Sequence, residues 1–156
     1  MDEFAKELSH KLHATQFRND GRTPYTVHTD YVGERAAYYL ERYLGKPSPS
    51  DIVRVRAAGF LHDCLEDHQY TNITSDKHLS YLGEEYNNWN EICYDVLTLS
   101  RFSKDEPIVD YLYRIKQNPY ARAVKLADLE HNLSDLRPGN LRDKYHLCQD
   151  YLIRGI

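Results

Sequence analysis

The sequence contains no segment that would place the chain in a membrane. Nowhere do 18 apolar residues follow one another, which is about the shortest run expected of a spanning helix. Residues 1–12 carry charged side chains throughout and lack the apolar stretch of a secretory signal. No long run of Lys or Arg is present, and the net charge of -4 argues against nucleic acid or an acidic membrane surface as the main partner. We therefore expect a soluble, cytoplasmic protein.

Cysteine is scarce and follows no recognisable pattern. The three cysteines, Cys64, Cys93 and Cys148, are widely spaced and include no Cys-x-x-Cys pair. An odd number at this spacing indicates neither a disulfide framework nor a structural zinc knuckle, and it fits a reducing compartment. We expect Cys64 to serve as a small buried hydrophobe without a catalytic role.

Strand alternation, internal repeats, low-complexity segments and linkers are absent from the sequence as well. Apolar residues instead recur at helical spacing, and one predicted stripe consists of Phe4, Leu8, Leu12 and Phe17. Ser50 and Asp51 are a plausible cap for a helix that continues to Asp67. The sequence predicts a single all-α domain over residues 1–156, with about seven or eight short helices. Further helices are expected over residues 31–44, 77–82, 84–99, 105–117, 120–133 and 141–154.

The most distinctive stretch is His-Asp-Cys-Leu-Glu-Asp at residues 62–67, where four groups able to bind a metal or move a proton lie within less than two helical turns. It follows the apolar run 52–61, which predicts a buried helix that carries its polar end into a pocket. In the alternative interpretation, residues 62–67 are simply the C-terminus of a helix, and their charged side chains face water. Burying an imidazole and three carboxylates without partners would cost several kcal/mol, and a cation is the simplest compensation.

Two other segments contain residues that a metal site would need. A loop shaped by Gly21 and Pro24 delivers His28 to the start of a helix. Farther along the chain, Asp128 and Asn132 are four residues apart and therefore share one face of a helix. Both segments are distant in sequence from residues 62–67, so the three can meet only in the fold.

Together these residues resemble the HD-superfamily hydrolase domain of RelA/SpoT-type alarmone hydrolases, especially the small stand-alone forms. The resemblance covers roughly residues 12–152 and implies a compact multi-helix bundle around a buried mononuclear metal site. The positions that match the family's motifs, in order, are Arg18, Gly21, Pro24, Tyr25, His28, His62, Asp63, Glu66, Asp67, Lys125, Asp128 and Asn132.

The resemblance implies that one divalent ion, usually manganese, is bound by His28, His62, Asp63 and Asp128. The chemistry agrees, because two imidazoles and two carboxylates suit manganese or iron better than structural zinc. Such an ion lowers the pKa of a bound water and neutralises charge on phosphorus. Glu66 and Asp67 form the acidic pair placed to position that water or to relay its proton, and their spacing leaves open which is the general base.

The resemblance also assigns a set of residues to the substrate side, namely Arg18, Tyr25, Lys125 and Asn132. For two of them a simpler interpretation exists. Arg18 could stack on a purine base or merely end the first helix with a favourable charge. Tyr25 could shape a nucleotide pocket or pack the loop against the core.

Three positions depart from the family pattern by lacking a cation that is common there: Asn19, Leu129 and Ser134. Each charge-assisted contact with a phosphate is worth about 1.5 to 3 kcal/mol, so a highly phosphorylated nucleotide should be held less tightly. The arginines that could substitute are Arg22, Arg101, Arg137 and Arg142.

We interpret the sequence as a metal-dependent phosphohydrolase that removes the 3′-pyrophosphate of guanosine tetra- or pentaphosphate (ppGpp, pppGpp) to leave GDP or GTP. This would end a stringent-response signal, and because no alarmone synthetase module is visible we expect degradation without synthesis. The missing cations support an alternative substrate, either the 2′-phosphate of NADPH or a nucleoside monophosphate. A second alternative is a non-catalytic nucleotide-binding domain. The sequence leaves the oligomeric state open.

Overall fold

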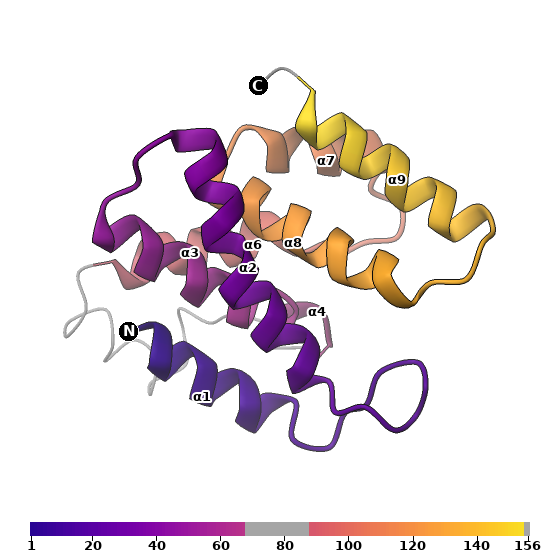
Figure 1. The fold of residues 1–156 in the computed structure, drawn as a ribbon, viewed down its shortest axis with the longest axis horizontal. Coiled ribbons are helices and arrows are strands. Elements are labelled where there is room, and N and C mark those ends of the chain that lie inside the picture. The colour runs from indigo at the N-terminus through magenta and orange to yellow at the C-terminus, as the bar shows by residue number, and fades with distance from the viewer. Residues whose placement is uncertain (68–87, 155–156) are drawn as a thin grey trace.

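The computed structural model describes residues 1–67 and 88–154, and all of the regular secondary structure in these ranges is helical (Figure 1). Within these ranges the only β-type pairing is an isolated bridge between Phe17 and Pro24. The all-α prediction is confirmed. The helices are α1 (Asp2–Leu12), α2 (Thr26–Leu44), α3 (Pro49–Leu61), α4 (Cys64–Asp67), α6 (Trp89–Leu99), α7 (Ile108–Lys116), α8 (Pro119–Asp135) and α9 (Asn140–Ile153).

Local capping explains where two of the central helices begin. At the start of α3, the Ser48 hydroxyl accepts from the Asp51 backbone N–H while the Asp51 carboxylate accepts from the Ser48 N–H, which is a capping box. Pro49 occupies the first turn, where its missing N–H costs nothing. The expected cap at Ser50 and Asp51 is therefore corrected: the N-cap is Ser48, and Asp51 is its partner in the capping box. The side chain of Asn118 accepts from two backbone N–H groups and caps α8 in the same manner.

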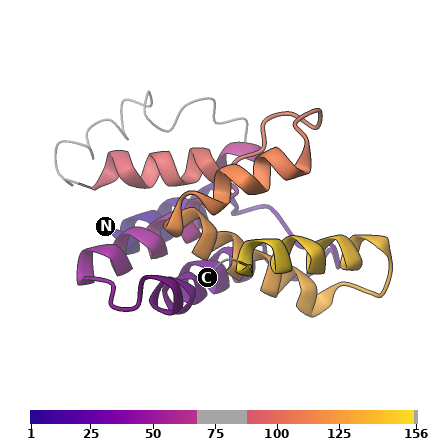
Figure 2. The ribbon, with the colours of Figure 1, turned by 90° about the horizontal axis from the view of Figure 1, so that it is seen from above.

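The long helix α2 packs against α8 on one side and α3 on the other, and α3 in turn contacts α1, α6 and α8. Figure 2 shows α9 on the opposite side of the molecule from α6, and α8 contacts both helices. The side chains that fill the space between these layers include Leu40, Phe60, Leu61, Trp89, Ile92, Ile115, Leu126 and Leu152. This packing brings the start of α2, the end of α3 and the middle of α8 into one region.

A buried ion pair joins three of these helices away from that region. The guanidinium of Arg54 in α3 makes two hydrogen bonds, of 2.7 and 2.9 Å, to the fully buried carboxylate of Asp95 in α6. Asn118, the cap of α8, donates to the same carboxylate at 2.7 Å. Because a buried polar group must be hydrogen-bonded and the donors here come from α3 and the cap of α8, this network fixes α3, α6 and α8 against one another.

Three expectations about elements need correction or fall outside the described residues. The helix that was expected to continue to Asp67 breaks after Leu61, and His62 and Asp63 lie in a turn before α4. Phe17 does not continue the stripe of α1, because the helix has ended and the ring is 54% exposed on the following loop. The helix expected over residues 77–82, and residues 84–87 of the next one, lie outside the described residues.

Candidate metal centre

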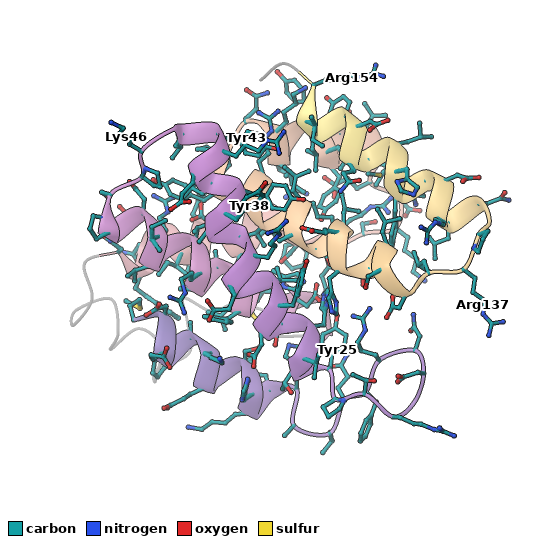
Figure 3. All side chains as sticks on the ribbon, viewed as in Figure 1. Tyr25, Tyr38, Tyr43, Lys46, Arg137 and Arg154 are labelled. Carbon is teal, nitrogen blue, oxygen red and sulfur yellow. The ribbon has the colours of Figure 1, made fainter. Side chains whose placement is uncertain are left out.

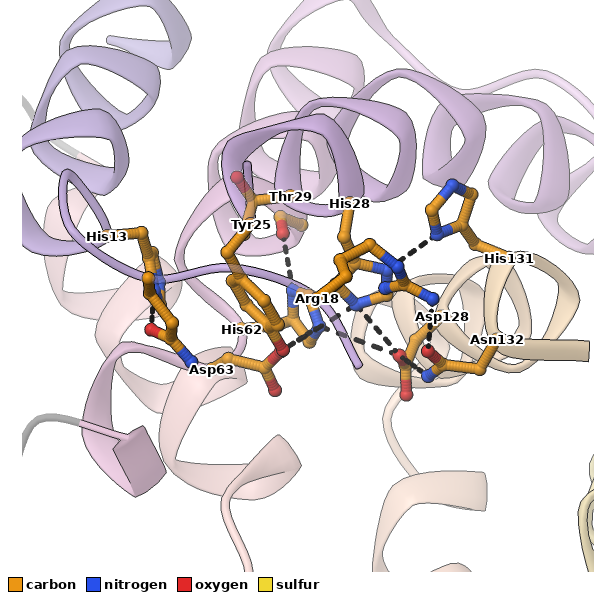
Figure 4. Close-up of polar contacts among 12 residues, drawn as sticks. His13, Arg18, Tyr25, His28, Thr29, His62, Asp63, Asp128, His131 and Asn132 are labelled. Carbon is orange, nitrogen blue, oxygen red and sulfur yellow. Dashed lines mark hydrogen bonds and ion pairs between the residues drawn. The ribbon is translucent and has the colours of Figure 1, made fainter. Parts of the chain in front are cut away.

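Three buried side chains from three separate helical segments meet at one point. His28 comes from the first turn of α2, His62 from the turn after α3, and Asp128 from the middle of α8. One ligand atom of each lies within 4.8 Å of the other two, so the three could hold a metal ion (Figure 4). The fold thus brings together the three segments that the sequence singled out.

The distances place carboxylate oxygens opposite imidazole nitrogens. Oδ1 of Asp128 lies 3.2 Å from Nε2 of His28 and 3.7 Å from Nε2 of His62. Oδ2 of Asp63 approaches the same two nitrogens from another direction, at 3.7 Å from His28 and 2.9 Å from His62. Asp63 is the most exposed of the four side chains.

The orientation of His62 fits a cation. Its Nδ1 lies 2.8 Å from the carbonyl oxygen of Gly59, one turn earlier in α3, so this nitrogen carries the proton and donates it. Its Nε2 is buried and makes no hydrogen bond of good geometry, although Asp63 lies close. A buried nitrogen lone pair facing two carboxylates is the arrangement that a divalent metal requires. A set of imidazole and carboxylate donors suits manganese, iron or zinc.

Two neighbours hold Asp128 in place. The ammonium group of Lys125 donates to Oδ2 at 2.6 Å, and the amide of Asn132 donates to Oδ1 at 2.6 Å. Burial alone would raise the pKa of Asp128, but Lys125 and the two histidines outweigh it and hold the pKa well below its usual value. The Asp128 carboxylate is therefore ionised and held in one direction. Both Lys125 and Asn132, which were predicted on the substrate side, contact this carboxylate.

The two carboxylates beside His62 also favour a cation at this point. Burial alone would lower the pKa of His62, but the carboxylates of Asp63 and Asp128 reverse this effect and raise the pKa well above its usual value. The centre therefore has an excess of negative charge that stabilises positive charge at Nε2. A divalent cation bound here would supply positive charge at the same position.

Tyr25 and His131 form a further layer around the four side chains. The Tyr25 hydroxyl donates to Oδ2 of Asp63, and the ring packs between those of His13 and His28. His131 places its Nδ1 2.8 Å from Nδ1 of His28. Burial and the neighbouring positive groups lower the pKa of His131 to about 4, so its ring is neutral near pH 7.

A polar cavity of about 350 Å³ opens beside the centre. Of the predicted site residues, seven line this cavity, whereas His28 and His62 lie buried behind it. The structure describes the backbone of Asp67 as the end of α4 but not its side chain. The cavity walls consist of Gln16, Phe17, Arg18, Asn19, Tyr25, Asp63, Glu66, Lys125, Asp128, Asn132 and Tyr145.

Arg18 is one of the residues that line this cavity. Its guanidinium donates to Oδ2 of Asp135 at 2.8 and 3.2 Å and to Oδ1 of Asn132 at 3.3 Å. The side chain is only 9% exposed, and it belongs to the loop that follows α1 by several residues. The alternative in which Arg18 ends the first helix is therefore wrong.

A second cavity of about 210 Å³ adjoins the first, and both share Glu66, Lys125 and Tyr145 in their walls. It is more apolar, and it adds two cations, Arg101 and Lys144. Of the four arginines considered as replacements for missing cations, Arg101 alone lines either of these cavities. Arg22 and Arg137 are exposed, and Figure 3 shows Arg137 pointing away from the molecule. Arg142 instead donates to the carbonyl oxygens of Leu133 and Leu136.

Glu66 occupies the junction of the two cavities. Its Oε1 accepts a hydrogen bond from the backbone N–H of Arg101, which fixes the carboxylate, and it shares the wall of the first cavity with Asp63 and Asp128. Partial burial raises the pKa of Glu66 above its usual value, and the nearby negative charge of Asp63 adds to this effect. A carboxylate with a raised pKa is suited to exchanging a proton.

Sequence reasoning missed His131, Lys144 and Tyr145. The first had a usable signal, because it lies three residues after Asp128 and so one helical turn along the same helix. Lys144 and Tyr145 come from α9, and their positions at the cavities follow only from how α9 packs on α8. Cys64 is buried as expected, and Cys93 and Cys148 also lie in the interior.

A family model described as HD domain matches residues 26–133, which is more than half of the chain. The matched range includes His28, His62, Asp63, Glu66 and Asp128 but neither the Arg18 loop nor α9. No curated protein matches this chain. Across residues 1–67 and 88–154, none of the helices combines the length and hydrophobicity needed to cross a membrane.

Proposed function

The chain belongs to the HD-domain family, whose members are generally metal-dependent phosphohydrolases, and we propose that it hydrolyses a phosphorylated guanine nucleotide. The observation that carries the proposal is the meeting of His28, His62 and Asp128 at one point beside a polar cavity. Its wall includes two cations, Arg18 and Lys125, and the carboxylate of Glu66. A phosphate ester needs charge neutralisation and a positioned water, and these groups would supply both.

Within this proposal, His28, His62, Asp63 and Asp128 hold one divalent cation, for which manganese is our first choice. When bound, such a cation acidifies a coordinated water and draws charge from a phosphate oxygen. Tyr25 orients Asp63, and Lys125 and Asn132 orient Asp128, so the ligand oxygens keep fixed directions. This arrangement limits the reorganisation that the reaction requires.

Glu66 would accept the proton of the attacking water, since its carboxylate lines the cavity next to Asp63 and is fixed by the backbone of Arg101. The water oxygen forms a bond to the phosphorus atom attached to the ribose 3′ oxygen. The bond between that phosphorus and the 3′ oxygen breaks, pyrophosphate leaves, and the 3′ oxygen gains a proton. Guanosine tetraphosphate and water thus become GDP and pyrophosphate. The part of Asp67 in this transfer stays a prediction.

The distribution of cations supports an anionic substrate that reaches both cavities. Arg18 lines the first cavity, Arg101 and Lys144 line the second, and Lys125 lines both. Of the three departures from the family pattern, Asn19 lines the first cavity and Leu129 the second. Ser134 lines neither of the two cavities, and its hydroxyl donates to the carbonyl of His131.

One observation favours a second substrate. Asn19 leaves the first cavity with one cation fewer than the family pattern provides, which suits a nucleotide with fewer phosphates. The 2′-phosphate of NADPH or a nucleoside monophosphate would fit such a cavity. A non-catalytic nucleotide-binding domain would have no use for Glu66 at the junction of the two cavities.

The test is a substrate panel. Protein loaded with Mn²⁺ is incubated with guanosine tetraphosphate, guanosine pentaphosphate, NADPH and nucleoside monophosphates, and the products are separated by chromatography. We expect GDP and pyrophosphate from guanosine tetraphosphate, with none formed by Glu66→Gln. If guanosine tetraphosphate stays intact while NADPH or a monophosphate turns over, the alarmone assignment is wrong and the second substrate replaces it.

A further inference from the structure

His131 makes a contact that neither the sequence motifs nor the proposed reaction explains. It lies in α8 three residues after Asp128, and its Nδ1 is 2.8 Å from Nδ1 of His28 (Figure 4). The two rings are tilted by 39° with centroids 4.9 Å apart. His131 belongs to neither of the two cavity walls, so it has no direct access to a ligand there.

Only one proton can lie between two facing nitrogens, and the position of His28 decides which ring carries it. Nε2 of His28 faces Asp128 at 3.2 Å and Asp63 at 3.7 Å, inside the candidate metal centre. A neutral imidazole that offers a lone pair at Nε2 must carry its proton at Nδ1. His28 is then the donor and Nδ1 of His131 the acceptor, with the proton of His131 at Nε2.

The two imidazoles of the centre are therefore anchored in parallel ways. Nδ1 of His62 donates to a backbone carbonyl, that of Gly59, at 2.8 Å. Nδ1 of His28 donates to a side chain, that of His131, at the same distance. A hydrogen bond at the outer nitrogen fixes the tautomer and the ring direction of a histidine ligand and raises its basicity. Because the partner of His28 is a side chain, a substitution at His131 can remove this hydrogen bond, whereas the backbone carbonyl that holds His62 cannot be removed in this way.

The acceptor itself is held between α2 and α8. The ring of Tyr31, one turn after His28 in α2, packs on His131 with centroids 4.5 Å apart. The backbone carbonyl of His131 accepts from the Ser134 hydroxyl at 2.6 Å. His131 therefore lies between two rings of α2, those of His28 and Tyr31, which restricts its rotation.

We propose that His131 is a positioning residue of the metal centre. It accepts the Nδ1–H of His28 and thereby keeps Nε2 of His28 directed at the cation, which raises the affinity of the centre for a divalent metal. The proposal rests on the metal centre of the proposed function. It gives His131 no contact with substrate and no proton transfer.

The test uses two variants to distinguish the hydrogen-bond acceptor at Nδ1 of His131 from the packing of its ring. His131→Phe keeps an aromatic ring against Tyr31 but has no acceptor, whereas His131→Asn loses the ring but can place Oδ1 where Nδ1 was. Each variant and the wild type are stripped of metal, and Mn²⁺ affinity is measured by competition with a chelator at one pH. The visible spectrum of the Co²⁺ form reports the geometry of the centre, and the melting temperature of the metal-free form controls for folding.

We expect His131→Phe to bind Mn²⁺ about tenfold to a hundredfold more weakly, the usual effect of losing such an outer partner, and to alter the Co²⁺ spectrum. His131→Asn should retain affinity within about threefold and keep the wild-type spectrum. Wild-type affinity in His131→Phe, or equal losses in both variants, overturns the acceptor role and leaves the proposed function standing. A wild-type protein that binds no divalent metal removes the metal centre and this inference together.

Discussion

Gly33 of α2 and Gly59 of α3 bring the two helix backbones into direct contact. A Cβ atom on Gly59 would lie 2.7 Å from the Cα of Gly33, and one on Gly33 would lie 2.3 Å from the ring of Phe60. His28 precedes Gly33 in α2, and His62 follows Gly59 and donates to its carbonyl oxygen. The separation of the two imidazoles is therefore set by a backbone contact.

Replacing either glycine by alanine should lower the free energy of unfolding. The better helix propensity of alanine contributes about 1 kcal/mol, but the steric clash costs about 1 to 3 kcal/mol or more when the opposing atoms belong to the backbone. We expect Gly59→Ala to be the worse of the two, since it meets the Cα of Gly33. Urea unfolding measures the change. Glu41→Ala, at an exposed position of α2, is the control and should change stability by less than about 0.5 kcal/mol.

Removing the metal should destabilise the fold, because one ion would connect α2, the turn after α3, and α8. A ligand present at a thousand times its dissociation constant stabilises the folded state by about 4 kcal/mol. We expect a chelator to lower the melting temperature and His62→Ala to lose its metal, as measured by elemental analysis. His10→Ala changes a surface histidine paired with Asp30 and should keep the metal. Full metal content in His62→Ala contradicts the ligand assignment.

Glu66→Gln should abolish turnover and spare metal binding, since Glu66 contacts the Arg101 backbone and not the ligand nitrogens. Loss of a positioned acid or base usually lowers a rate by at least about a hundredfold. The same holds for the double variant with Asp67→Asn, in which neither carboxylate can relay a proton. Steady-state kinetics together with metal analysis would check this. Near-normal rates in the double variant would mean that proton transfer occurs elsewhere.

Asn19→Lys should strengthen substrate binding, because it restores a cation to the wall of the first cavity. One charge-assisted phosphate contact corresponds to roughly a tenfold lower Michaelis constant for guanosine tetraphosphate. The gain should shrink as salt is added. Ser134→Lys also adds a cation, but outside both cavity walls, so it should leave the Michaelis constant unchanged. Equal effects of the two variants would indicate long-range attraction rather than a contact.

Acid should destabilise the start of α3 through Asp51. Hydrogen bonds from Tyr120 and Ser48 lower the pKa of Asp51 below its unfolded value of 3.8. A carboxyl whose pKa is lower in the folded state contributes stability above pH 3.8, and this contribution disappears as the pH falls through the folded pKa. Unfolding measured between pH 2 and pH 7 should show a shallower acid dependence in Asp51→Asn than in the wild type. Identical slopes would exclude this contribution.

The sequence predicted the helical architecture because helix formation depends on local signals, whereas the meeting of the three segments was implied by the resemblance of their motifs to a known family. Apolar residues recur at helical spacing where one face of a helix packs against the core, and this pattern is visible in residues 52–61. The break at His62 was missed because the apolar pattern continues through it into α4, where Cys64 and Leu65 are buried. The cap of α3 was misplaced because Ser48 and Ser50 are equally good candidates until the bond to Asp51 is seen.

The contacts around the centre could not be predicted, because they join helices that are distant in sequence. Nothing in the sequence places His131 against His28, or Arg18 against Asp135. The same is true of Lys144, whose side of α9 is set by packing on α7 and α8. Sequence spacing identifies residues with suitable chemistry, and the packing of α2, α8 and α9 decides which of them meet.

The pairing of α2 with α8 has a kinetic consequence for how the site acquires its ion. His28 and Asp128 are separated by most of the chain, so they approach each other only after a long loop has closed. Short-range contacts cannot assemble the full ligand set, because Asp128 joins His28, His62 and Asp63 only after α8 has docked. Metal loading should therefore follow folding rather than guide it. The ion that the protein acquires is then selected by the finished cavity and by the free metals that surround the folded chain.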